Sequence, residues 1–153
     1  MMEHIAIMKK SWGLLPRILS GQKTIESRWL TTQSAPWDKV HEGDRIYFKD
    51  SGEPVVVRAT VSHVLQLDDL SPQRISDILD FYGEDDGILP EELPKYEALF
   101  RDKTYCVLIF LEDIQLVEPF SIDKHGFGLQ TAWLTTHSVD SLRQPTLTKP
   151  SKR

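Results

Sequence analysis

Short β-type segments separated by turns recur through most of the chain, and this pattern limits the fold more than any other feature. The expected strands cover residues 4–9, 24–30, 45–49, 55–67, 104–111 (continuing to about 117) and 131–136. Turns rich in Gly and Asp at 41–44 and 50–54 separate neighbouring strands. About six short strands at this spacing favour a closed or partly closed barrel, because closure removes exposed sheet edges. With the helices described next, the sequence predicts an α+β fold built on a small mixed β-barrel.

A short helix is expected between the first two strands. Apolar residues recur at helical spacing over 14–19. Ser11 stands where a side-chain oxygen could cap the start of this helix. Gly21 is expected to end it, because glycine readily takes the left-handed conformation that closes a last turn. The helix therefore leads the chain directly into the strand at 24–30.

Most of the acidic charge lies in one segment, residues 68–102. This segment contains 11 acidic and three basic residues, whereas the rest of the chain contains 12 acidic and 15 basic ones, so the net charge of −5 originates here. Two helices are expected in it, one after Ser71-Pro72 and one from 91 or 94 to 100. The acidity can mark a solvated helical face, or it can hold the segment away from a polyanionic ligand. We expect this insertion to lie outside the barrel and away from the ligand face.

The stretch Ser20–Trp29 carries more charge than a buried strand tolerates. Successive side chains of a strand point to opposite faces, so Glu26 and Arg28 share one face, with Lys23 at the strand entrance. Trp29 falls on the other face and is expected in the core. Because unpaired buried charge is costly, the charged face either meets solvent or lines a polar pocket.

Two motifs carry a resemblance to a known family. The pattern Gly21-x-Lys23-x-x-Glu26-x-Arg28 resembles the signature of the ASCH domain. A second segment is similar to the end of ASCH sequences: Pro119-Phe120-x-Ile122-x-Lys124-x-Gly126-Phe127-Gly128, then Ala132-Trp133. The resemblance spans residues 5 to about 135 and implies a PUA-like barrel, here predicted as a domain of residues 1–143 that includes the acidic insertion. Residues 144–153 are polar, contain two prolines and are predicted to be a disordered tail.

The candidate ligand-binding residues surround the charged strand. Lys and Arg bind phosphate oxygens, a carboxylate accepts from an exocyclic amine, and an indole ring can stack on a base. Structural alternatives remain open, because Glu26 and Arg28 can form an ion pair that props the barrel mouth, and Trp37 can cover a core edge. The predicted site comprises Lys9, Ser11, Trp12, Lys23, Glu26, Arg28, Trp37, Lys49 and Lys124.

Several common site types have no matching pattern in the sequence. The five histidines show no metal-ligand spacing, and Cys106, the single cysteine, lies in an apolar run where an inert buried thiol is expected. No Walker-type loop, dinucleotide fingerprint or nucleophile elbow is present. We therefore predict neither a metal nor a cofactor. Without a secretory signal or an apolar run of about 18 residues, the chain is predicted to be cytoplasmic and to have no membrane partner.

The function hypotheses follow from the charged strand and the resemblance. ASCH domains are regarded as RNA-associated, so the main hypothesis is a domain that binds RNA, a nucleotide or a modified nucleoside in a basic pocket at the motif. Lys23→Ala and Arg28→Ala are expected to weaken such binding without unfolding the protein. The alternative is a hydrolase of the ribonuclease or amidohydrolase type, with Lys23 and Glu26 as catalytic candidates.

One further expectation concerns the hydrolase, and a third hypothesis stands beside the first two. In the amidohydrolase branch of the family a catalytic Thr falls where this chain has Glu26, so the expected nucleophile is missing and little deacetylation of acetylated cytidine is expected. A third hypothesis is a protein-interaction module that docks a basic partner on the acidic segment 68–102.

Overall fold

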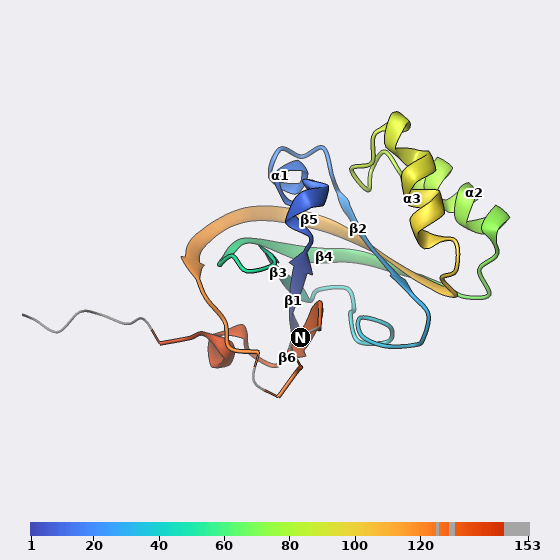
Figure 1. Cartoon of the computed structure of the whole chain (residues 1–153). Helices are drawn as coiled ribbons and strands as arrows, with labels where there is room; N and C mark the ends of the chain where they lie inside the picture. Colours follow the sequence, from blue (N-terminus) through green and yellow to red (C-terminus); the bar gives the residue numbers. More distant parts are fainter. Residues whose placement is uncertain (125, 129–130, 146–153) are drawn as a thin grey trace, which may run out of the picture.

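A single six-stranded sheet, in the order β2-β5-β4-β3-β1-β6, curls into a half-barrel (Figure 1). The structure is a computed structural model and describes residues 1–124, 126–128 and 131–145. The strands are β1 (Glu3–Met8), β2 (Ile25–Leu30), β3 (Arg45–Asp50), β4 (Val55–Leu67), β5 (Tyr105–Phe120) and β6 (Trp133–Thr136). The predicted α+β barrel of about six strands is therefore confirmed, in its partly closed form, because β2 and β6 remain as the two edges of the sheet.

The register of the strands follows the alternation of apolar residues. β1 runs parallel to β3 and antiparallel to β6, while β4 pairs antiparallel with both β3 and β5. On β5, Val107 and Ile109 enter the core formed with β1, β3 and β4, whereas Cys106 and Leu108 enter a second core on the opposite face. The expectation of a strand covered on both faces is therefore confirmed for this part of β5.

The chain between β1 and β2 forms the expected short helix, α1 (Leu14–Leu19). Gly21 adopts a φ of +82° just beyond it, which confirms the predicted left-handed stop. The expectation that Ser11 caps this helix is wrong. A 3-10 turn, η1 (Lys10–Trp12), follows β1, and Gly13 with a φ of +66° then redirects the chain into α1, so Ser11 lies inside the turn instead of at the helix start.

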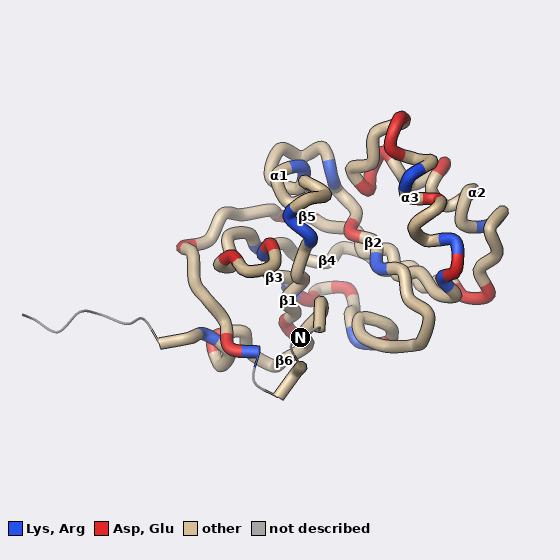
Figure 2. The backbone as a smooth tube through the Cα atoms, viewed as in Figure 1, with Lys and Arg blue, Asp and Glu red and all other residues tan. Residues whose placement is uncertain are grey.

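The acidic segment forms α2 (Pro72–Tyr82), the 3-10 turn η2 (Pro90–Glu92) and α3 (Leu93–Phe100). Ser71 caps α2, since its hydroxyl oxygen accepts from the backbone N–H of Arg74 at 3.2 Å. The two helices pack on one end of the curled sheet, where their apolar faces meet β2 and β5 in the second core (Figure 1). Acidic residues, red in Figure 2, recur along these helices and their connecting loops.

The last described residues pack back onto the sheet. The short turn η3 (Val139–Leu142) buries Val139, and the backbone N–H of Gln144 donates to the carbonyl of Ser121 at 2.8 Å. Of the predicted tail, residues 146–153 lie outside the described residues. No helix in the described part of the chain is both long and apolar enough to cross a membrane.

Candidate functional site

A pocket of about 260 Å³ opens where the curled sheet brings β2 near β1 and the loop before β6. We call it the seam pocket. One wall comes from β2, one from the end of β1 with η1, and one from the insertion. Its lining residues are Ile7, Met8, Lys9, Trp12, Leu14, Glu26, Ser27, Arg28, Trp29, Asp86, Ile88, Tyr96, Leu99, Phe100, Lys103 and Ala132.

Lys23 lies behind this wall, with 1% of its surface exposed. Its ammonium nitrogen Nζ donates to the backbone carbonyls of Ile25 at 2.6 Å and Asp86 at 2.7 Å. The same nitrogen lies 2.5 Å from Oδ1 of Asp86 and 3.2 Å from Oε1 of Glu26. All hydrogens of the ammonium are thus engaged inside the protein, and Lys23 holds two buried carboxylates together.

The loop between α2 and η2 is shaped to receive Lys23. The backbone N–H groups of Thr24 and Ile25 both donate to the carbonyl of Asp85, at 2.7 and 2.9 Å. Gly87 has a φ of +80°, and a Cβ atom there would lie 2.8 Å from Cβ of Lys23. Glycine is therefore needed twice over, for the left-handed backbone and for the close approach to the lysine stem.

Asp86 brings the acidic insertion into the site. Its Oδ1 meets Lys23, and its Oδ2 accepts a hydrogen bond of 2.6 Å from the hydroxyl of Ser27. That hydroxyl oxygen in turn accepts from Nε1 of Trp29 at 3.0 Å. The insertion does lie outside the half-barrel, but the expectation that it stays away from the candidate site is wrong. It supplies a buried carboxylate and much of the aromatic wall.

Arg28 joins the two edges of the sheet. Its Nη2 lies 2.9 Å from Oε2 of Glu26, which confirms that these neighbours on one strand face form an ion pair. The same guanidinium donates across the seam to the carbonyls of Ile7, at 3.3 Å, and Ala132, at 3.2 Å. It also stands over the ring of Trp133, 5.2 Å from the ring centroid. The structural alternative, an ion pair that props the barrel mouth, is therefore present.

The two carboxyl groups that contact Lys23 have pKa values shifted in opposite directions. Burial favours the neutral form of Glu26, but the charges of Lys23 and Arg28 outweigh it, and the pKa of Glu26 is lowered. Asp86 has no arginine partner, so burial, reinforced by the charge of Glu26, raises its pKa despite Lys23. Burial also disfavours the charged form of Lys23, but the negative charges of Asp86 and Glu26 outweigh this effect, so the pKa of Lys23 is raised. Asp86 is therefore the group of the three that is nearest to exchanging a proton.

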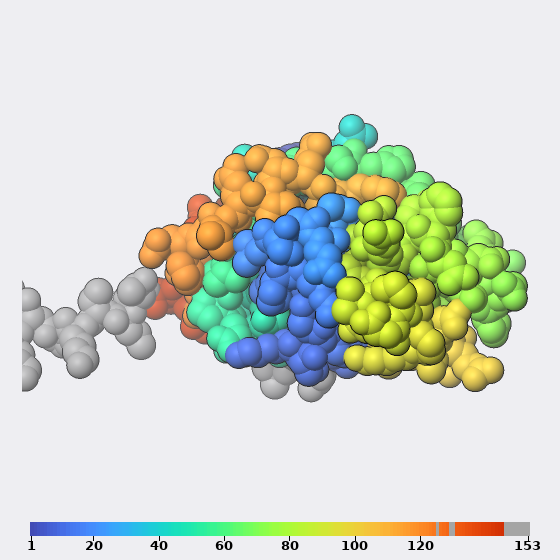
Figure 3. All heavy atoms as spheres, turned by 90° about the horizontal axis from the view of Figure 1, so that it is seen from above, coloured from blue at the N-terminus to red at the C-terminus, as the bar shows by residue number. Residues whose placement is uncertain are grey.

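An aromatic wall faces this polar cluster. Trp29 and Phe100 are stacked with ring centroids 4.6 Å apart, and Trp12 meets the edge of Tyr96 at 5.5 Å. The hydroxyl of Tyr96 is enclosed and has no hydrogen-bond partner among the described residues. Seen from above, the α1 region and the insertion lie side by side, and Arg17 links them through bonds to Glu92 and the carbonyl of Gly87 (Figure 3).

The predicted site residues divide into two groups. Lys9, Trp12, Glu26 and Arg28 line the seam pocket, with Lys23 directly behind them. The other four predicted residues do not line it: Ser11, Trp37, Lys49 and Lys124.

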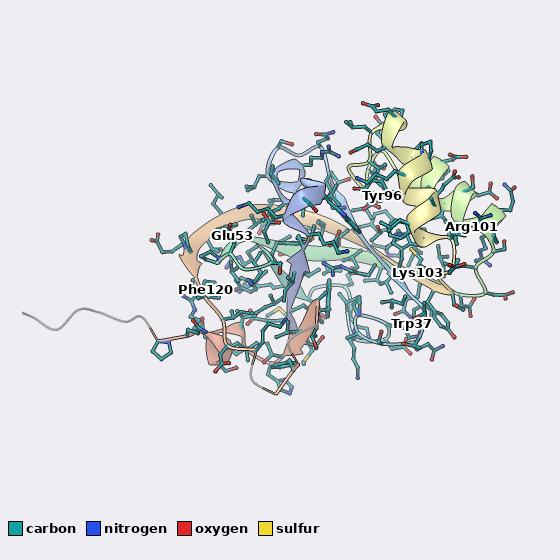
Figure 4. All side chains as sticks on the ribbon, viewed as in Figure 1. Trp37, Glu53, Tyr96, Arg101, Lys103 and Phe120 are labelled. Carbon is teal, nitrogen blue, oxygen red and sulfur yellow. The ribbon has the colours of Figure 1, made fainter. Side chains whose placement is uncertain are left out.

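For three of these four residues the structure shows a different place. Trp37 is 9% exposed and packs against Tyr105, so it covers a core edge. It lies away from Tyr96, which lines the seam pocket (Figure 4). Lys49 is buried in β3, where burial and the nearby charge of Lys124 lower its pKa. Ser11 is exposed on the turn η1.

Several pocket residues were missed by sequence reasoning: Ser27, Asp86, Tyr96, Phe100 and Lys103. Asp86, Tyr96 and Phe100 lie in the segment 68–102, which was expected to stay away from the ligand. The one sequence signal for Asp86 is Gly87 beside it, because a glycine in an acidic loop can mark a close approach to another segment. Among the described residues, no three metal-ligating side chains come together.

Comparisons with known proteins identify the fold. The sequence matches no protein-family model and no curated protein. The structure is similar to the crystal structure of ASCH from Zymomonas mobilis, with a TM-score of 0.64 and 18% identity over 93% of this chain and 96% of that one. Structures of two single-residue mutants of the same protein align with TM-scores of 0.65 and 0.62, at 17% and 18% identity. Each covers 91% of this chain, and the alignments cover 93% and 91% of those chains.

Proposed function

Because the chain has the fold of the ASCH domain, we propose that its seam pocket binds a nucleobase, presented by RNA or by a nucleotide-like ligand. The observation that carries the proposal is the pairing of an aromatic wall with two buried carboxylates in one small pocket. Bases are recognised by stacking on aromatic side chains and by hydrogen bonds to their edges. At about 260 Å³ the pocket is slightly smaller than the ~300–1,000 Å³ common for drug-sized ligands, which suits a single nucleoside.

The polar side of the pocket favours a base that donates hydrogen bonds. Lys23 and Arg28 are balanced by Glu26 and Asp86, so the interior differs from the basic pocket expected from the sequence. Ionised carboxylates only accept hydrogen bonds, and each oxygen has two acceptor sites. Glu26 and Asp86 therefore keep acceptor capacity for a base edge. A base with an exocyclic amine matches this arrangement better than uracil does.

The expected effect of Lys23→Ala also changes with this geometry. Removal of its buried ammonium would leave two carboxylates without their shared cation, so the variant is expected to lose stability as well as any binding. Lys23 is therefore unsuited to a binding test. The test needs a pocket residue whose replacement does not leave buried charges unpaired.

Trp12 offers that test. It is half-buried and lines the pocket, and isothermal titration calorimetry measures ligand affinity in the same way for wild type and for variants that lack this indole. We expect Trp12→Ala to weaken the binding of cytidine or adenosine by about 1–3 kcal/mol, the range measured for stacking on one base, and Trp12→Phe to retain most of it. Phe81→Ala is the matched control, because Phe81 is an aromatic residue that is 77% exposed and outside the pocket. Equal affinities in wild type, Trp12→Ala and Phe81→Ala would refute the proposal.

A second candidate function is hydrolysis of a modified nucleoside in the same pocket. The observation that favours it is the divergence of two neighbouring carboxyl pKa values, lowered for Glu26 and raised for Asp86, because such pairs can divide acid and base roles. The catalytic candidates then change. Lys23 does not line the pocket and would act by holding the carboxylates, while Asp86 would exchange the proton.

Turnover separates the two candidates. Incubation with acetylated cytidine should leave the substrate unchanged if the domain only binds. Product formation that is lost in Asp86→Asn, while nucleoside binding persists, would instead establish the hydrolase.

A further inference from the structure

We infer that the rim of the seam pocket is a phosphate subsite formed by Lys9 and Lys103, so that its preferred occupant is a phosphorylated nucleotide, not a nucleoside. The inference rests on the proposed function and adds the orientation of the ligand. It places the base against Glu26 and Asp86 and the phosphate at the mouth. The argument starts from which cations of this region are already engaged.

Two of the four cationic side chains near the motif already bind oxygen atoms of the protein. Lys23 has four oxygen atoms around its ammonium nitrogen, within 3.2 Å, and is enclosed. Arg28 uses Nε and Nη2 on Glu26, and it uses Nη1 and Nη2 on two backbone carbonyls across the seam. Lys23 therefore has no donor left for a phosphate, and Arg28 keeps at most one Nη1 hydrogen, because its other donors hold the two sides of the seam together.

The other two cationic side chains are not held by an ion pair with any described residue. Lys9 and Lys103 both line the pocket, and neither forms an ion pair with a described residue. Lys9 is exposed at the end of β1, with its Nζ 5.1 Å from the ring centroid of Trp12. Lys103 is half-buried and lies just beyond α3, the helix that carries Tyr96, and both residues line the pocket (Figure 4). Positive charge therefore stands on two walls of the pocket, next to its aromatic residues.

The polarity of the pocket then matches that of a nucleotide. Its interior offers carboxylate acceptors, and its rim offers two ammonium groups with free donors. A ligand with amine donors at one end and an anion at the other satisfies both, with the base stacked at Trp12 between them. A free nucleotide and an RNA chain share this chemistry, and the experiment distinguishes them.

The test compares cytidine, cytidine 5′-monophosphate and cytidine 3′-monophosphate with wild type by fluorescence titration at low salt. We expect at least one monophosphate to bind about tenfold more tightly than cytidine, and this advantage to shrink as salt rises. Lys9→Gln and Lys103→Gln, which keep the side-chain stems, should each lose about threefold of the monophosphate affinity, so that the ratio of monophosphate to cytidine affinity falls in both variants. Lys39→Gln, an exposed lysine outside the pocket, is the control and should change neither.

The outcomes separate this inference from the proposed function. If cytidine and both monophosphates bind equally and the lysine variants have no effect, the phosphate subsite is refuted while the base pocket stands. If no probe binds, the proposed function fails and the subsite fails with it. A trinucleotide that binds more tightly than the monophosphate supports the subsite with RNA as the source, whereas equal binding supports it with a free nucleotide.

Discussion

Replacing Lys23 with methionine removes the cation that two buried carboxylates share, while the unbranched stem is kept. Glu26 retains Arg28 at 2.9 Å, but Asp86 retains only the hydroxyl of Ser27. Removing one partner of a buried ion pair costs about 3–5 kcal/mol, because the remaining charge is left unpaired. The backbone carbonyls of Ile25 and Asp86 also lose a donor. We therefore expect the free energy of unfolding to fall by at least about 4 kcal/mol, out of a total of ~5–15 kcal/mol for a domain.

Urea unfolding followed by far-UV circular dichroism measures this loss, and a second substitution tests its cause. In wild type, Asp86→Asn should destabilise, because Lys23 loses its closest partner. In the Lys23→Met background the same substitution should stabilise, because it removes the unpaired charge. The expected coupling is about 1–3 kcal/mol. Effects that add to within about 0.5 kcal/mol would refute the argument that the lysine neutralises Asp86.

The pH dependence of Lys23→Met gives an independent check. Without the lysine, the pKa of Asp86 should rise further, because burial then acts with no nearby cation to oppose it. A carboxyl group whose pKa is raised in the folded state gains stability as the pH falls through that pKa. The deficit relative to wild type should therefore shrink as the pH is lowered from neutral into the acid range. A deficit that stays constant over this range would contradict the mechanism.

Three further predictions concern single positions. Gly87→Ala should cost about 1–3 kcal/mol more than Gly52→Ala in urea unfolding, because both have a φ near +80° but only at Gly87 would Cβ meet Lys23, at 2.8 Å; equal costs would count against the close approach. Ser71→Ala should lower the unfolding free energy by about 1 kcal/mol through the lost cap of α2, and no change would mean that the cap is not stabilising. Burial lowers the pKa of His4 in spite of Asp44, so the folded state resists a proton that the unfolded chain accepts below about pH 6.5. Wild-type stability should thus fall from pH 7 to pH 5.5, and a His4→Gln variant with the same slope would contradict this.

Local features of this protein were predictable from its sequence. β4 has the predicted bounds, α1 begins and ends where the apolar stripe does, and Glu26 pairs with Arg28 because a strand places them on one face. Each of these depends on residues close together in the chain, where backbone geometry alone fixes their relation. Trp29 belongs here too, since alternation assigned it to the core and it stacks on Phe100.

The contribution of the insertion to the site was not predictable in the same way. Asp86 is one of 11 acidic residues in its segment, and its role depends on burial against a lysine far away in the chain. Charge counting treats all members of such a run alike, whereas desolvation distinguishes the one that is enclosed. Lys103 was missed for a similar reason, because only the folded chain shows that it lines the same pocket as Lys9.

The position of β1 between β3 and β6 has a consequence for synthesis on the ribosome. β1 can pair with β3 once residue 50 has emerged, but its other edge stays open until residues 133–136 follow. At a synthesis rate of ~5–20 residues per second, that edge is unpaired for roughly 10 seconds. An unpaired strand edge is a template for association with other chains. The nascent chain, more than the finished domain, is therefore the form of this protein that most needs a chaperone.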